Sequence, residues 1–162
     1  LTEPAHGNTR HTHPNFRRIC STKSHRKKIE YMIKTFEEVF ERFRKMKFKE
    51  EFDIIVAIAN GGIIPAAIIN QRLEKEIHLL KINLRDPFQQ PKYDSPQLMA
   101  PIDFEYKGKK ILLVEDRIKT GKTIKFACEL LKEADLIKTF AVNGNADYAL
   151  YNEACFRFPW II

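Results

Sequence analysis

The sequence predicts an α/β protein with a mostly parallel, twisted sheet flanked by helices. Short apolar, β-rich segments alternate with segments of helical periodicity, which is the pattern of a parallel sheet covered on both faces. With 162 residues, 44% of them hydrophobic, the chain is long enough for one domain with a substantial core. We therefore expect a flexible arm over residues 1–20 and a single domain over residues 21–162.

The N-terminal third is expected to supply the arm and one helix. Residues 1–20 contain Pro4, Gly7 and Pro14 and show no periodicity. From about Ser24 onward, apolar residues recur every three or four positions, which predicts a helix with one apolar face turned to the core. The members of this stripe are Ile29, Met32, Ile33, Phe36, Val39, Phe40, Phe43 and Met46.

The centre of the chain is expected to form a strand, a helix, a second strand and a long loop. Residues 52–60 form an apolar run typical of a strand buried on both faces. A helix should follow over residues 61–73, with Pro65 in its first turn, and a second strand over residues 77–84. Residues 85–107 contain four prolines and little periodicity, so we expect a long loop, and loops of this length are typically functional lids or disordered.

The C-terminal part is expected to continue the same alternation. We predict a strand over residues 109–115, a helix near residues 121–134 and a strand near residues 138–142. The final residues, CFRFPWII, are apolar and aromatic, and this composition favours packing against the core or a lid.

The segment ILLVEDRIKTGKTI, residues 111–124, carries the strongest functional signal. Glu115 and Asp116 stand where the strand ends, and ligands of open parallel sheets bind beyond that end. Carboxylates accept hydrogen bonds from the vicinal hydroxyls of a ribose. The following loop offers backbone N–H groups, with the hydroxyls of Thr120 and Thr123, at a helix N-terminus that suits a phosphate. The segment therefore predicts a site for a ribose 5-phosphate.

Two other interpretations of this segment fail. A nucleotide-binding P-loop needs a glycine five residues before Gly121, where this chain has Asp116. A response-regulator receiver domain has such an acid pair near its start, but only 47 residues follow Glu115. Both classes are therefore excluded.

Three motifs together resemble the type I phosphoribosyltransferase family. VEDRIKTGKT is similar to the family's ribose-phosphate signature, and IVAIANGGIIPAAII to the loop that binds pyrophosphate. Asp147-Tyr148 and Phe158-Pro159-Trp160 resemble the small C-terminal hood of xanthine/guanine and archaeal purine phosphoribosyltransferases. The resemblance covers roughly residues 30–160 in the family's order and spacing.

The resemblance implies an enzyme that transfers ribose 5-phosphate from 5-phosphoribosyl 1-pyrophosphate (PRPP) to a nitrogenous base, with Mg²⁺ and with release of pyrophosphate. It implies catalytic roles for Glu115, Asp116 and Lys119, the two acids acting on the metal indirectly, through ribose and diphosphate. Val142 and Phe156 would stand on the base side. The PRPP-binding residues would be Asn60, Gly61, Gly62, Arg85, Glu115, Asp116, Lys119, Thr120, Gly121, Lys122 and Thr123.

The acceptor side departs from the family pattern. Enzymes of 6-oxopurine salvage usually have an Asp, as proton acceptor, where this chain has Lys119. Their 6-oxo-binding Lys falls near Val142, and Cys155 or Phe156 occupies the place of their stacking aromatic. Asn60 stands where a basic residue commonly precedes the two glycines. We therefore expect a base, whether purine or not, other than guanine or hypoxanthine.

Charge and composition leave a competing hypothesis open. Residues 10–49 hold 13 Lys and Arg against 4 Asp and Glu, within a net charge of +7. This basic surface would suit a non-catalytic or regulatory ribose-phosphate-binding protein that binds nucleic acid, although a solvated helix face explains it more simply.

The sequence also gives expectations about membrane association, cellular compartment and oligomeric state. No apolar run is long enough for a transmembrane helix and no secretory signal is visible, so no membrane partner is expected. Three cysteines without metal-ligand spacing are typical of reduced thiols in a cytoplasm. A homodimer or higher homo-oligomer is expected by resemblance to the family.

Overall fold

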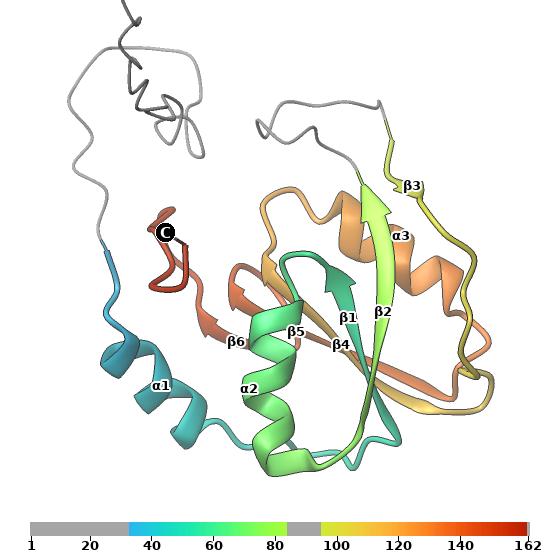
Figure 1. Ribbon diagram of the computed structural model, residues 1–162, viewed down its shortest axis with the longest axis horizontal. Helices are drawn as coiled ribbons and strands as arrows, with labels where there is room; N and C mark the ends of the chain where they lie inside the picture. The colour runs from blue at the N-terminus through green and yellow to red at the C-terminus, as the bar shows by residue number, and fades with distance from the viewer. Residues whose placement is uncertain (1–32, 84–94, 162) are drawn as a thin grey trace, which may run out of the picture.

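A computed structural model describes residues 33–83 and 95–161. The sheet has six strands in the order β3-β2-β1-β4-β5-β6, and every neighbouring pair is parallel except β2 and β3. This architecture confirms the predicted fold class (Figure 1). The elements are α1 (Phe36–Lys45), β1 (Ile54–Ala59), α2 (Ile63–Leu73), β2 (Glu76–Asn83), β3 (Gln97–Leu98), β4 (Lys110–Arg117), α3 (Lys122–Leu130), β5 (Leu136–Asn143) and β6 (Tyr148–Tyr151).

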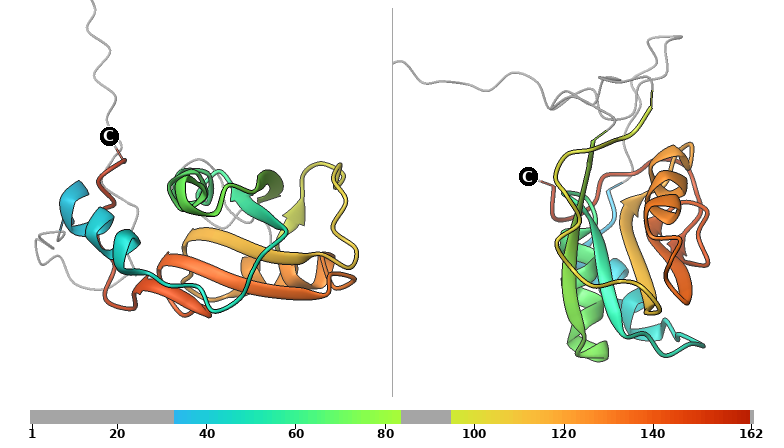
Figure 2. Two further views of the ribbon diagram at one scale, coloured as in Figure 1. Left: turned by 90° about the horizontal axis from the view of Figure 1, so that it is seen from below. Right: turned by 90° about the vertical axis from the view of Figure 1, so that its right-hand side faces the viewer.

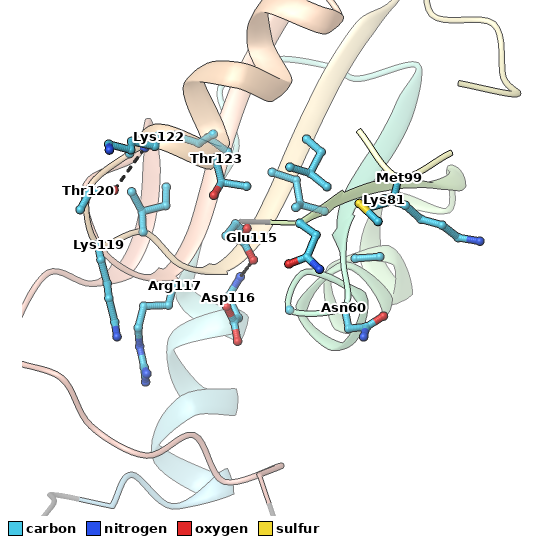
Figure 3. Close-up of a pocket in the computed structure, with 18 of the residues that line it drawn as sticks. Asn60, Lys81, Met99, Glu115, Asp116, Arg117, Lys119, Thr120, Lys122 and Thr123 are labelled. Atoms are coloured by element: carbon cyan, nitrogen blue, oxygen red, sulfur yellow. Dashed lines mark hydrogen bonds between the residues drawn. The ribbon is translucent and has the colours of Figure 1, made fainter. Parts of the chain in front are cut away.

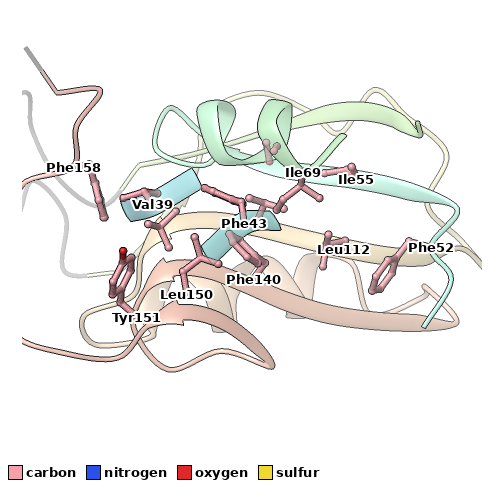
Figure 4. Close-up of a cluster of buried hydrophobic side chains, with 14 of the residues drawn as sticks. Val39, Phe43, Phe52, Ile55, Ile69, Leu112, Phe140, Leu150, Tyr151 and Phe158 are labelled. Atoms are coloured by element: carbon pink, nitrogen blue, oxygen red, sulfur yellow. The ribbon is translucent and has the colours of Figure 1, made fainter. Parts of the chain in front are cut away.

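Helices cover both faces of the sheet. Side chains of α1 and α2 pack on one face, where Phe43 stacks on Phe140 of β5 with ring centroids 5.7 Å apart (Figure 4). Ile124 and Ala127 of α3 are buried against the other face. Figure 2 shows α2 and α3 on opposite sides of the sheet. Because β1 and β4 are covered on both faces, five of the six residues of β1 and residues 111–114 of β4 are buried, as their apolar sequences predicted.

The first helix begins later than its apolar stripe suggested. Thr35 is its N-cap: the Thr35 hydroxyl accepts from the Glu38 N–H, and the Glu38 carboxylate accepts from the Thr35 N–H. This capping box fixes the start of the helix at Phe36. The predicted helix is therefore wrong at residues 33–35, and Ile33 is exposed. Residues 24–32 lie outside the described part of the chain.

Two strands were not predicted. β3 lies inside the segment expected to be an irregular loop and pairs antiparallel with the end of β2. β6 adds to β5 through a link of only four residues, 144–147, although parallel neighbours normally need about a dozen connecting residues. Tyr148 therefore belongs to the sheet rather than to the hood in which we expected it.

Other boundaries and expectations were also tested. The helix after the acid pair ends at Leu130 rather than near residue 134. Phe156 and Phe158 are both buried, which confirms the core packing predicted for the aromatic tail. The arm at residues 1–20 and residues 85–94 of the expected lid, with Arg85, lie outside the described residues.

Two findings bear on the surroundings of the protein. In the described part of the chain, no helix is both long and apolar enough to cross a membrane. Among the described residues, Cys128 is a free thiol, which agrees with the reduced state expected for it.

Candidate functional site

A cleft lies where the direction of chain winding changes across the sheet. From β1 the chain crosses to β2 on one side, and from β4 it crosses to β5 on the other. The chain segments that leave the carboxyl ends of β1 and β4 therefore run in opposite directions. The crevice between them is where open α/β sheets bind ligands. A cleft of about 650 Å³ opens there, lined by residues from the ends of β1, β2 and β4 and from the loop after β4 (Figure 3).

The turn between β1 and α2 fits tightly against the acid pair. The Ala59–Asn60 peptide bond is cis, and Gly61 and Gly62 follow it. A Cβ at Gly61 would lie 2.6 Å from both Asp116 Oδ1 and Glu115 Oε1. A Cβ at Gly62 would lie 2.2 Å from the Val114 carbonyl oxygen. A side chain has no room at Gly62, and at Gly61 it fits only if the two carboxylates move, so the bare backbone of the turn is open to a ligand.

The acid pair lies at the end of β4, where the two carboxyl groups are close together. The Asp116 N–H donates to Glu115 Oε1 at 3.1 Å. Burial and then the charge of Asp116 raise the pKa of Glu115 well above its usual range. Burial also raises the pKa of Asp116, although the neighbouring Arg117 opposes this shift. The pair is therefore costly to keep ionised until a ligand provides hydrogen bonds to it.

This electrostatic cost predicts that Glu115→Gln stabilises the protein. The folded-state pKa of Glu115 is raised, so its ionised form disfavours folding above that pKa, and the penalty disappears as the pH falls through it. We expect the free energy of unfolding to rise by about 1 kcal/mol at pH 8. The melting temperature should rise by about 2–4 °C, with less gain under acid conditions.

Calorimetric melting at pH 8 and pH 5 measures this gain. Glu129→Gln is the matched control, since Glu129 lies on the surface of α3 in an exposed ion pair with Lys132. This substitution should change the free energy of unfolding by no more than about 0.5 kcal/mol. A melting temperature for Glu115→Gln below that of the wild type at pH 8 would contradict the electrostatic account.

The loop after β4 leads into the N-terminus of α3. Gly121 has φ +74° and is the N-cap of the helix, a conformation that favours glycine. The first N–H groups of a helix have no partner within it, and they favour an anion. Thr120, Lys122 and Thr123 line the cleft beside these groups, so the loop has the composition of a phosphate site.

The structure brings most of the predicted donor residues together. The cleft is lined by Asn60, Gly61, Glu115, Asp116, Lys119, Thr120, Gly121, Lys122 and Thr123. Gly62 lies just behind them, against the backbone of β4. Val142 and Phe156, expected on the base side, are instead buried in the core and do not line the cleft.

Sequence reasoning missed several lining residues. Lys81 and Asn83 come from the end of β2, Met99 follows β3, and Ile161 comes from the C-terminal segment. Lys81 could have been found from its place near the carboxyl end of a predicted strand. Met99 and Ile161 carry no such signal, because an isolated apolar residue does not reveal which surface it meets.

Comparisons with known proteins agree with this geometry. The phosphoribosyl transferase domain family matches residues 27–156. A xanthine-guanine phosphoribosyltransferase from Idiomarina loihiensis is 27% identical over 118 residues, which are 68% of this chain and 72% of that protein. An orotate phosphoribosyltransferase from Pyrobaculum islandicum is 29% identical over 104 residues, 64% of this chain and 50% of that protein.

Structural similarity extends over most of the domain. The crystal structure of a purine phosphoribosyltransferase from Pyrococcus horikoshii superposes with a TM-score of 0.67 and 24% identity, over 80% of this chain and 92% of that one. At this identity the superposition supports the fold, and the match over residues 27–156 supports the family. The chain belongs to the phosphoribosyltransferase family.

Proposed function

We propose that this protein transfers ribose 5-phosphate from PRPP to a nitrogenous base and releases pyrophosphate. The observation that carries the proposal is the arrangement of three features around one cleft: the bare backbone of the Gly61 turn, the Glu115–Asp116 pair and the loop at the start of α3. A diphosphate, a ribose and a 5′-phosphate need these three kinds of partner, in this order.

Each feature has a chemical task in the proposed reaction. The bond between C1 of the ribose and the diphosphate oxygen breaks, and a nitrogen of the base forms a bond to C1. Positive charge develops on the ribose as the diphosphate leaves, and fixed negative charge beside it stabilises that state. We assign this charge, and the contacts with the ribose hydroxyls, to Glu115 and Asp116. The turn at residues 60–62 would hold the diphosphate through the backbone N–H of Gly61, because the Gly62 N–H already donates to the Ile58 carbonyl oxygen.

Mg²⁺ fits the chemistry of this cleft. Among the described residues there is no cluster of three or more His, Cys, Asp or Glu side chains that could hold a metal ion. Mg²⁺ does not need one, because it keeps several waters and binds through one or two carboxylates together with substrate phosphates. Glu115 and Asp116 would hold it through the ribose and diphosphate, and its charge would offset that of the leaving diphosphate.

Lys119 bears on the identity of the acceptor. Its side chain lines the cleft one residue before the Thr120–Gly121 turn. A protonated Lys offers three hydrogen-bond donors and no acceptor. It therefore suits a base that presents oxygens or negative charge, and it cannot remove a proton from a purine.

Calorimetric titration of PRPP with Mg²⁺ tests the donor site through Asp116→Asn. This substitution removes a charge at the centre of the cleft, and we expect the affinity to fall at least about tenfold, or roughly 1.4 kcal/mol. Asp135→Asn is the control, because Asp135 is exposed at the amino end of β5, away from the cleft. Equal affinities for the two variants would remove Asp116 from the donor site.

A further inference from the structure

We propose that Arg117 is a positioning residue, which holds the C-terminal segment, residues 153–161, as the acceptor-side wall of the cleft. This inference rests on the proposed function. It assigns to Arg117 a part in acceptor binding that is separate from donor binding.

Arg117 connects the acid pair to the C-terminal segment directly. It is the last residue of β4 and follows Asp116. Its guanidinium donates a hydrogen bond to the Phe156 carbonyl oxygen, and its Cζ lies 4.3 Å from the centre of the Phe158 ring. Burial lowers the pKa of Arg117 and the charge of Asp116 opposes this. Arg117 therefore remains a cation at the end of β4, and both of these contacts are with the C-terminal segment.

The contacts of Arg117 continue along the segment to the cleft itself. The Phe158 ring stacks on Trp160 with centroids 5.1 Å apart, and the Phe158 carbonyl accepts a hydrogen bond from the Ile161 N–H at 3.1 Å. Ile161 lines the cleft together with Arg117. A shift of Phe158 would therefore move the part of the wall that Ile161 supplies.

Asn143 anchors the start of the segment. It lies opposite Arg117 in the pairing of β4 with β5, and its side chain is 4% exposed. Its carbonyl accepts from the Ile118 N–H at 3.0 Å, and its amide group both donates to and accepts from the Glu153 backbone. Two neighbouring strand ends thus fix the segment at residues 153 and 156–158.

The position of the segment assigns it to the acceptor. The Gly61 turn and the loop at residues 119–123 are allotted to the diphosphate and the 5′-phosphate. The remaining lining includes Lys81, Asn83 and Met99 from β2 and the segment after β3. It also includes Arg117, which directly follows the acid pair, and Ile161 of the segment that Arg117 contacts. A base that attacks C1 must approach next to the ribose, so the wall held by Arg117 is the one it meets.

Arg117→Met tests the inference against Arg42→Met. The control makes the same two kinds of contact, because Arg42 donates to the Leu150 carbonyl oxygen at 2.7 Å and its Cζ lies 4.1 Å from the centre of the Tyr151 ring. Arg42 belongs to α1 and does not line the cleft. The two variants therefore lose the same two kinds of contact, although Arg42 is exposed and Arg117 is half-buried.

We expect Arg117→Met to raise the KM for the acceptor between about tenfold and about 10²-fold, because a small misplacement of a binding surface costs this much. The dissociation constant of PRPP with Mg²⁺ should stay unchanged, and Arg42→Met should change neither quantity. Arg117→Lys, which keeps the charge without the planar fork, should lie between wild type and Arg117→Met, and it replaces Arg117→Met if that variant does not fold. The acceptor is whichever of xanthine, guanine, hypoxanthine, adenine and orotate gives the fastest pyrophosphate release.

Trp160 gives a second readout, which needs no acceptor. It is the only tryptophan in the chain. Quenching of its fluorescence by acrylamide therefore reports on the solvent exposure of the C-terminal segment. Quenching should increase in Arg117→Met and remain at the wild-type level in Arg42→Met. If the wild type does not bind PRPP, the proposed function is rejected, but the comparison of fluorescence quenching between Arg117→Met and Arg42→Met still tests the role of Arg117. Identical quenching and identical acceptor KM in the two Met variants would overturn the role given to Arg117.

Discussion

Gly61→Ala should abolish tight PRPP binding while leaving the protein folded. The added methyl group would lie 2.6 Å from the ends of both the Glu115 and the Asp116 side chains, which real Cβ atoms essentially never do. These carboxylates can rotate away at little cost to stability, but they then leave the position from which they contact the ribose. A displacement of about 1 Å in a reacting geometry costs about 10²-fold. We expect at least that loss in kcat/KM, measured by pyrophosphate release.

Two other glycines provide the controls. A Cβ at Gly62 would meet the backbone of Val114 and Ile58, which cannot rotate away. Gly62→Ala should therefore lower the melting temperature strongly, whereas Gly61→Ala should not. Gly108→Ala has open space around it but a φ of +64°, so it should cost about 1–2 kcal/mol of stability without affecting PRPP. Wild-type kinetics in Gly61→Ala would show that the turn does not contact the acid pair in solution.

Lys119→Asp should improve the use of guanine or hypoxanthine, which we expect to be poor acceptors for the wild type. An Asp at this position supplies a proton acceptor that Lys119 cannot supply while protonated. General-base assistance contributes about 10²- to 10⁴-fold. We expect the low end of this range or less, because Val142 is buried in the core and provides no side chain to pair with a 6-oxo group.

Steady-state rates with both bases measure this change. Lys125→Asp is the charge-matched control, since it alters the net charge equally but does not line the cleft. Rapid guanine turnover by the wild type that is lost in Lys119→Asp would show that Lys119 takes part in purine transfer instead of preventing it.

The two central strands and the loop after β4 were predicted well, because their own sequences carry the signal. Residues 54–59 and 111–114 are apolar and lie where helices cover the sheet on both faces, so composition was sufficient to place β1 and β4. The acid pair and the loop after it were also predicted, because a parallel strand presents its carboxyl end to the ligand whatever the rest of the fold.

Features that depend on distant contacts could not be predicted. The apolar stripe extends N-terminal to Phe36, but the helix begins only at Phe36. The reciprocal hydrogen bonds of Thr35 and Glu38 set that start. β6 forms because the Asp147 carboxylate accepts hydrogen bonds from the Thr139 backbone and hydroxyl, which secures the short return after β5. The partners of Arg117 are about 40 residues away along the chain, so its sequence neighbours do not reveal them.

The most direct test of the account is pyrophosphate release by the wild-type protein, with PRPP and Mg²⁺, measured in turn with each of the five bases. The account predicts release that requires both PRPP and one base, that is slow with guanine and hypoxanthine, and that falls in Asp116→Asn but not in Asp135→Asn. PRPP binding without release for any base would instead favour a regulatory ribose-phosphate-binding protein. Absence of both binding and release would contradict the donor site itself.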